Sequence, residues 1–243
     1  MKKLASILLA LCMMLSLSMG TMAFAKSGTA ANAGKTYNVK VIDHNTRYPF
    51  DAIIYKPVGI KLKVGVVFYA GYPVDYRDYG PLLKKIASYG YLVISPEFPM
   101  DTAITNARAG EEYMKQYPGI KTWFLAGHSH GGGTACVEAS MKPDLFKGLI
   151  LIAGAPFVTV LPNDYPVLTI HATEDQAVPL VQHKIQLATI ANCDVTDVYI
   201  KGGNHQQFGD YGEQPNDGVA TISAKKQVNI TVKHILKFIK KYQ

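Results

Sequence analysis

A serine lies between two glycines in Gly127-His128-Ser129-His130-Gly131, the pattern Gly-x-Ser-x-Gly. An apolar run at 122–126 precedes it, and a glycine-rich helical pattern reaching about Met141 follows it. A sharp strand-to-helix turn strains the nucleophile's backbone, and flanking glycines let the strand and the helix approach each other. The N–H groups and dipole of a helix N-terminus favour the negative charge of a tetrahedral intermediate. The pattern therefore predicts that Ser129 is a catalytic nucleophile.

A serine hydroxyl attacks well only when a base removes its proton and a third group orients that base. In acyl hydrolases with a nucleophile of this type, the acid and then the histidine follow the serine along the chain. Asp175 comes shortly after a strand-like segment at 167–171, and His205 comes shortly after the next one at 195–200. We predict that Asp175 is the acid and His205 is the base, with Glu174 as the alternative acid.

Two backbone N–H groups are expected to bind the oxyanion. The residue after the nucleophile normally supplies one of them, which here is His130, and a loop after the third strand supplies the other. That loop is 70–73, and we choose the N–H of Tyr72, with Gly71 as the alternative. Loss of one such donor typically costs roughly 3 to 4 kcal/mol in the transition state.

Strand-like and helix-like segments alternate along the chain, which predicts one α/β domain over 36–243 with a mostly parallel sheet and helices on both faces. The expected strands are 37–42, 52–55, 64–69, 91–94, 122–126, 148–153, 167–171 and 195–200. The expected helices are 79–89, 104–117, 129–141, 180–190 and 224–242.

The connection 154–164 is too short to build a helical cap, so an open, shallow site is expected. The residues predicted to line the substrate site are Tyr72, His130, Phe157 and Phe208, with Val158 as a further candidate. For the apolar residues among them, ordinary packing in the core or a loop is the alternative. His171, near a strand end, is a further candidate for the lining of the site.

The N-terminal segment has the features of a secretory signal. Lys2 and Lys3 precede an apolar run, 4–19, and Ala23-Phe24-Ala25 places small residues where a signal peptidase reads. We predict a signal peptide at 1–25, a flexible leader at 26–35 and a secreted mature protein. A retained anchor is the alternative, although the run is shorter than the roughly 20 residues that span a bilayer. No second apolar span follows, so stable membrane insertion after cleavage is not expected.

The remaining composition excludes several other classes. The formal charge is +7 and the lysines are scattered, with no basic-aromatic stripe typical of nucleic-acid binders. Cys136 and Cys193, the two cysteines after the signal, do not make a disulfide framework. Segment 208–218 is rich in oxygen ligands but lacks EF-hand spacing, and no nucleotide-binding loop or zinc-binding set is present. We therefore expect no metal and no cofactor, and a monomer.

The motifs together resemble the α/β-hydrolase superfamily, and more narrowly its small lidless bacterial branch, α/β-hydrolase fold-5, which is related to dienelactone hydrolases. The resemblance covers nearly the whole mature chain and implies an eight-stranded sheet and a Ser-Asp-His triad. Some likeness to cutinase-like polyesterases is also present. The resemblance to the superfamily rests on Tyr69-Ala70-Gly71-Tyr72, Gly127-His128-Ser129-His130-Gly131-Gly132-Gly133, 173–179 and 203–209.

Two departures from that pattern are visible. Dienelactone hydrolases proper use a cysteine where this chain has Ser129, and fold-5 relatives carry Pro-Gly-Gly where it has Ala70-Gly71-Tyr72. The resulting prediction is an exported serine hydrolase that cleaves small-molecule or polymeric carboxylic esters. The alternatives are an acyltransferase or a peptidase with the same triad, and a catalytically silent binding module of this fold.

Overall fold

The computed structural model describes residues 35–44, 51–157 and 160–243. The predicted signal peptide and almost all of the predicted leader lie outside these residues, as does Val158. Among the described residues, no helix is both long enough and apolar enough to cross a membrane.

An eight-stranded sheet forms the centre of the domain, in the order β1-β2-β4-β3-β5-β6-β7-β8. Its first two pairings, β1 with β2 and β2 with β4, are antiparallel, and all later pairings are parallel. The mostly parallel α/β sheet expected from the sequence is thus confirmed. The strands are β1 (Val39–His44), β2 (Ala52–Pro57), β3 (Val64–Tyr69), β4 (Leu92–Pro96), β5 (Thr122–His128), β6 (Leu149–Ile152), β7 (Pro166–Ala172) and β8 (Asp194–Ile200).

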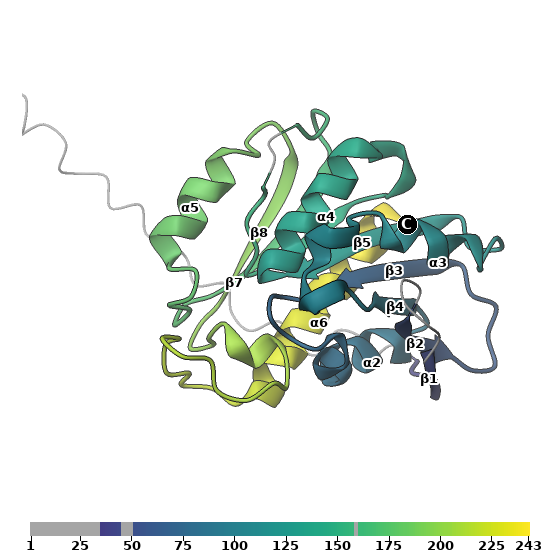
Figure 1. Ribbon diagram of the computed structural model, residues 1–243, viewed down its shortest axis with the longest axis horizontal. Coiled ribbons are helices and arrows are strands. Elements are labelled where there is room, and N and C mark those ends of the chain that lie inside the picture. The colour runs from purple at the N-terminus through teal and green to yellow at the C-terminus, as the bar shows by residue number, and fades with distance from the viewer. Residues whose placement is uncertain (1–34, 45–50, 158–159) are drawn as a thin grey trace, which may run out of the picture. The chain divides into compact units, whose positions relative to one another are not determined.

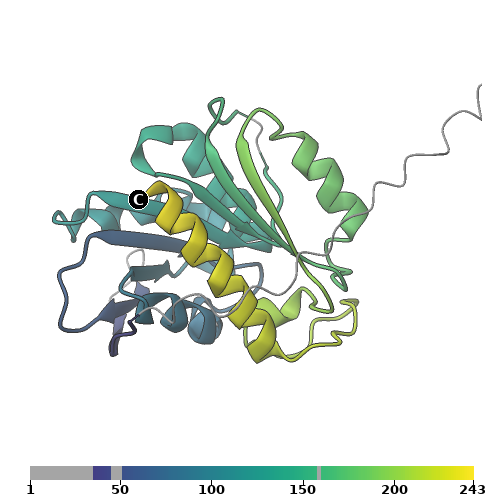
Figure 2. The ribbon, with the colours of Figure 1, turned by 180° about the vertical axis from the view of Figure 1, so that it is seen from behind.

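Helices cover both faces of this sheet (Figures 1 and 2). Helices α2 and α6 pack together on one face, and α3 and α4 contribute to the core on the other. The α-helices are α2 (Gly80–Ser88), α3 (Ala109–Lys115), α4 (Ser129–Met141), α5 (Leu180–Ala188) and α6 (Ala224–Tyr242). Short 3-10 helices lie at η1 (Tyr76–Tyr79), η2 (Pro99–Asp101), η3 (Ala103–Asn106), η4 (Pro143–Leu145) and η5 (Gln206–Phe208).

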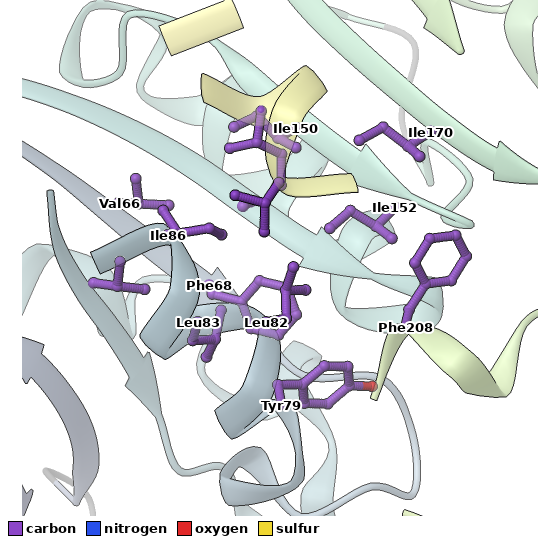
Figure 3. Packing of buried hydrophobic residues seen from close by; sticks show 14 of the residues in the cluster. Val66, Phe68, Tyr79, Leu82, Leu83, Ile86, Ile150, Ile152, Ile170 and Phe208 are labelled. Atoms are coloured by element: carbon purple, nitrogen blue, oxygen red, sulfur yellow. The ribbon is translucent and has the colours of Figure 1, made fainter. Parts of the chain in front are cut away.

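The core between the sheet and helices α2 and α6 is built from aliphatic and aromatic side chains. Phe68, Tyr79, Leu82, Ile152 and Phe208 belong to it, and Figure 3 shows these side chains converging between strands and helix. Each of these five side chains is no more than 2% exposed. Full burial of a large apolar side chain stabilises a fold by roughly 1.5–3 kcal/mol. This layer therefore holds the strands of the sheet in place against α2 and α6.

One expected helix is not continuous. The pattern at 104–117 predicts a single helix, but the structure has η3, a break, and then α3. The break is a turn at 107–108. Gly110 lies in the first turn of α3, where its N–H donates to the Tyr69 hydroxyl 3.1 Å away. A tertiary contact therefore satisfies one of the N–H groups that lack a partner within the helix at the start of α3, which local periodicity does not report.

Candidate active site

The turn that holds Ser129 joins β5 directly to α4. Ser129 is the first residue of the helix and has φ 51°, a left-handed value that side chains other than glycine rarely adopt. A Cβ on Gly127 would lie 2.5 Å from the Gly131 backbone, and a Cβ on Gly131 would lie 2.2 Å from the Ala70 carbonyl oxygen. The two glycines therefore permit a close approach of strand, helix and the loop after β3, as expected from the sequence.

The predicted base and acid lie side by side. Nδ1 of His205 is 2.8 Å from Oδ2 of Asp175, and both side chains are almost completely buried. The other carboxylate oxygen of Asp175 accepts a hydrogen bond from the N–H of Val178 at 2.7 Å. This fixes the carboxylate, so that it can hold the His205 ring in one orientation. The alternative acid, Glu174, instead accepts a hydrogen bond from the Thr173 hydroxyl.

Asp217 links the two loops that carry this pair. Its Oδ1 accepts from the N–H of Gln176 at 3.1 Å, and its Oδ2 accepts from the N–H of Gln206 at 2.9 Å. These are the residues that directly follow Asp175 and His205. The oxygen-rich segment 208–218 thus directs one carboxylate at backbone donors. The described residues contain no group of three or more His, Cys, Asp or Glu side chains placed to hold a metal ion.

His128, which precedes Ser129, lies against His205. The centroids of the two rings are 4.5 Å apart, and His128 is 1% exposed. Because the ring is buried and lies near the charge that His205 can carry, the pKa of His128 is well below its ordinary value. His128 is therefore a neutral ring that lies between the turn of Ser129 and the loop of the predicted base, His205.

The loop after β3 meets this turn from the other side. Register pairs Tyr69 with Gly127, which places residues 70–72 beside the start of α4. The N–H of Gly71 donates to the Tyr79 hydroxyl at 3.1 Å, so this N–H is already engaged inside the protein.

Three aromatic rings form a strip beside Ser129. The centroid of the His130 ring is 6.0 Å from that of Tyr72 and 5.1 Å from that of Phe157. Tyr72 is 57% exposed and Phe157 is 49% exposed, so both offer apolar surface to solvent. These are three of the four residues expected to contact a substrate.

The fourth does not fit that expectation. Phe208 is 1% exposed and packs 5.6 Å from the His128 ring, because the turn after His205 directs it into the core (Figure 3). His171 is also buried and stacks on His183 with the ring centroids 4.3 Å apart, so it does not line an open site. Phe208 therefore supports the site from behind instead of forming its wall.

Tyr79 and Asp217 were not selected from the sequence as site residues. Tyr79 lies in a helical pattern eight positions after Gly71, and Asp217 lies in a polar loop. No local motif marks either position, because each side chain accepts hydrogen bonds from backbone N–H groups in another segment of the chain.

Comparison with known families identifies the chain. A model of the alpha/beta hydrolase family matches residues 65–229, more than half of the sequence. The chain belongs to the alpha/beta hydrolase family. The family assignment agrees with the resemblance found in the motifs and makes this protein a hydrolase.

Two solved structures show a similar fold. Est1E from Butyrivibrio proteoclasticus matches with a TM-score of 0.58 and 17% identity, covering 83% of this chain and 99% of its own. A predicted CIB-like hydrolase from Thermoplasma acidophilum matches with a TM-score of 0.56 and 18% identity, covering 84% of this chain and 100% of its own. A search of curated proteins found no match. No cap domain is evident among the described residues, since β6 and β7 are joined only by 153–165.

Proposed function

We propose that this alpha/beta hydrolase is an exported serine hydrolase that cleaves carboxylic esters through a covalent acyl-enzyme. The observation that carries the proposal is the buried 2.8 Å contact between His205 and Asp175, beside the strained turn of Ser129. The contact between the His128 and His205 rings supports placing both loops in one site. Serine, histidine and aspartate in this order are the set that acyl hydrolysis requires.

The proposed reaction has two halves. Oγ of Ser129 attacks the ester carbonyl carbon while Nε2 of His205 takes the hydroxyl proton, and Asp175 stabilises the imidazolium through Nδ1. The tetrahedral intermediate collapses, and His205 gives its proton to the departing alcohol. Water then attacks the acyl-enzyme while Nε2 of His205 takes a proton from it. The second tetrahedral intermediate collapses, His205 returns that proton to Oγ of Ser129, and the carboxylic acid leaves.

The oxyanion of each tetrahedral intermediate is proposed to accept hydrogen bonds from the N–H groups of Tyr72 and His130. His130 follows the nucleophile in the first turn of α4, where backbone N–H groups lack partners within the helix. The engagement of the Gly71 N–H by Tyr79 supports Tyr72 over Gly71 as the second donor. Helix α4 contributes the positive end of its dipole at the same place.

The aromatic strip favours esters with a bulky or apolar group. Tyr72, His130 and Phe157 present ring surface beside Ser129, and the short 153–165 connection leaves the strip uncovered by a cap among the described residues. We propose small aromatic or polymeric esters as substrates, without nucleic-acid or membrane partners and with a monomeric enzyme.

The test is hydrolysis of p-nitrophenyl esters, from acetate to a long acyl chain, by the mature protein and by Ser129→Ala. We expect the variant to lose at least about a thousandfold in kcat, since removal of a triad nucleophile costs more than that in related chemistry. An unchanged thermal unfolding midpoint shows that the variant is folded. Hydrolysis that survives in Ser129→Ala would refute the assigned nucleophile, and faster acyl transfer to an added alcohol than to water would favour a transferase.

Labelling separates an enzyme with an unusual substrate from a binding module. A fluorophosphonate probe is expected to modify Ser129 in the wild-type protein and not in Ser129→Ala, with the site located by peptide mass spectrometry. Absence of both ester hydrolysis and labelling would refute the serine-hydrolase proposal and favour the silent module.

Export is proposed from the sequence of the first 25 residues. The polypeptide recovered from the medium of the native host, or of a secreting host, is expected to begin at Lys26, after Ala23-Phe24-Ala25. N-terminal sequencing reads this directly. A full-length protein beginning at Met1 that remains with the cell membrane would instead support the retained anchor.

A further inference from the structure

One buried hydroxyl touches both sides of the candidate active site. The side chain of Tyr79 is 0% exposed, and its oxygen lies 3.1 Å from the Gly71 nitrogen and 2.8 Å from Nδ1 of His128. Gly71 belongs to the loop after β3, and His128 belongs to the turn after β5. The hydroxyl therefore joins the loop that would bind the oxyanion to the turn that holds Ser129.

The direction of the hydrogen bonds follows from their donors. The Gly71 N–H can only donate, so the Tyr79 oxygen accepts from it. Of the two groups that contact the Tyr79 hydroxyl here, only Nδ1 of His128 can accept its proton. Burial raises the pKa of Tyr79 well above its ordinary value, so the phenol keeps this proton. A neutral His128 that accepts at Nδ1 must carry its own proton on Nε2.

The chain of contacts continues to the predicted base. The His128 ring is 4.5 Å from the His205 ring and 5.6 Å from Phe208, centroid to centroid. A side chain held on one edge by Tyr79 and on its face by these rings cannot rotate freely. Its position limits where the His205 ring can lie.

We propose that Tyr79 is a positioning residue whose hydroxyl sets both the oxyanion loop and, through His128, the ring of His205. The inference rests on the proposed ester hydrolysis. Holding the Gly71 N–H leaves the next N–H, that of Tyr72, to serve the oxyanion. Since catalytic geometry must hold to about 0.5 Å, loss of one buried hydroxyl is sufficient to lower the rate.

The deciding comparison is Tyr79→Phe against Tyr76→Phe. Both tyrosines lie in η1 and both are buried, but the Tyr76 hydroxyl has no hydrogen-bond partner among the described residues. We expect Tyr79→Phe to lower kcat roughly ten- to hundredfold with KM within about twofold, which is less than the loss of a whole oxyanion donor. Tyr76→Phe is expected to keep the wild-type kcat.

A transition-state analogue separates positioning from a general loss of structure. An alkyl trifluoromethyl ketone forms a hemiketal oxyanion on the serine, so its Ki should rise in Tyr79→Phe by about the same factor as kcat falls. KM for the matching ester should stay within about twofold. Equal kcat and Ki in Tyr79→Phe and wild type, with active wild type, would overturn this inference and leave the proposed function intact. Absence of Ser129-dependent hydrolysis in the wild type would instead overturn the proposed function.

Histidine NMR tests the hydrogen-bond chain without a substrate. In wild-type protein labelled with ¹⁵N-histidine, the resonances that disappear in His128→Gln are expected to show an unprotonated Nδ1 and a protonated Nε2. Tyr79→Phe should change these shifts and those of His205, whereas Tyr76→Phe should not. A protonated Nδ1 on His128 in the wild type would overturn the inference even if Tyr79→Phe fails to fold.

Discussion

The hydroxyl of Tyr69 donates a 2.5 Å hydrogen bond to Oε2 of Glu138, and both side chains are 0% exposed. Tyr69 ends β3 and Glu138 lies in α4, so the bond connects the strand before the loop 70–73 to the helix that begins at Ser129. The other carboxyl oxygen of Glu138, Oε1, has no hydrogen-bond partner among the described residues. Burial raises the pKa of Glu138 from 4.5 to about 8, so the carboxyl is protonated at neutral pH.

This raised pKa makes stability depend on pH. Between pH 4.5 and 8 the unfolded chain releases a proton that the folded protein keeps. The contribution of Glu138 to stability is therefore complete below about pH 4.5 and is lost as the pH rises to about 8. Glu138→Gln, which cannot ionise, should match the wild type near pH 4.5 and exceed its free energy of unfolding by a few kcal/mol at pH 8.

Urea unfolding at pH 4.5, 6 and 8 measures this difference. The control is Glu112→Gln, which removes an exposed carboxylate from α3 and should not alter the pH profile. A Glu138→Gln profile parallel to that of the wild type would contradict a buried, protonated Glu138.

The assignment of the acid is tested by Asp175→Asn beside Glu174→Gln. Asparagine can still accept from the Val178 N–H, but its amide would face Nδ1 of His205 and favour the wrong tautomer. We expect kcat for a p-nitrophenyl ester to fall by about 10⁴, as the corresponding change does in serine proteases. Glu174→Gln should stay within about twofold of the wild type. The reverse order of effects would make Glu174 the acid.

Asp217 is expected to hold the acid and base loops together. Asp217→Ala leaves the exposed N–H of Gln176 and the half-buried N–H of Gln206 without their acceptor. A donor that water cannot reach costs about 1–3 kcal/mol when it is unpaired, and this cost falls on Gln206. We predict a lower unfolding midpoint and at least about a tenfold loss in kcat, because a displaced His205 transfers protons poorly. Asp210→Ala removes an exposed carboxylate from the same segment and serves as the control. Equal kinetics in the two variants would show that the Asp217 bonds do not position the loops.

The elements that carry their own local pattern were predicted well from the sequence. Helix α6 begins and ends where expected, because Ser223 caps it by accepting from the Lys226 N–H and its apolar residues recur at helical spacing. The central parallel strands β3 and β6 were located by their continuous apolar runs. The strand-turn-helix around Ser129 was found from its glycines, and the order of Asp175 and His205 along the chain led to their pairing.

The features that the sequence did not predict depend on contacts between distant residues. The first turn of α3 is held by a bond between Gly110 and Tyr69, and the burial of Phe208 follows from the direction of a turn. The hydroxyl of Tyr79 and the carboxylate of Asp217 act on backbone groups in other loops. Helical or strand periodicity reports which face of an element is buried, but not which polar partner that face meets.

Phe157 is expected to set the preference for the acyl or alcohol group. Its ring is 49% exposed and packs on His130 beside the nucleophile. Phe157→Ala should raise KM for aromatic and long-chain esters several-fold, because loss of buried apolar contact costs about 25 cal/mol per Å². An ester with a short acyl group and a short alcohol, such as ethyl acetate, has little apolar surface to lose and should change little. Val219→Ala, at a residue 87% exposed, is the control, and a uniform loss across all esters would exclude a role in specificity.

Gly131 should tolerate no side chain, since its missing Cβ lets α4 approach the oxyanion loop. An added Cβ would lie 2.2 Å from the Ala70 carbonyl oxygen and 2.3 Å from that of Tyr69, and backbone atoms cannot rotate away. Gly131→Ala should lower stability by about 1–3 kcal/mol or more and displace the loop that carries Tyr72. Gly119→Ala, where a Cβ meets no atom within 4 Å, should stay within about 0.5 kcal/mol of the wild type. Thermal unfolding midpoints and kcat of both variants measure this, and retention of both values by Gly131→Ala would contradict a close packing of the loop against the helix.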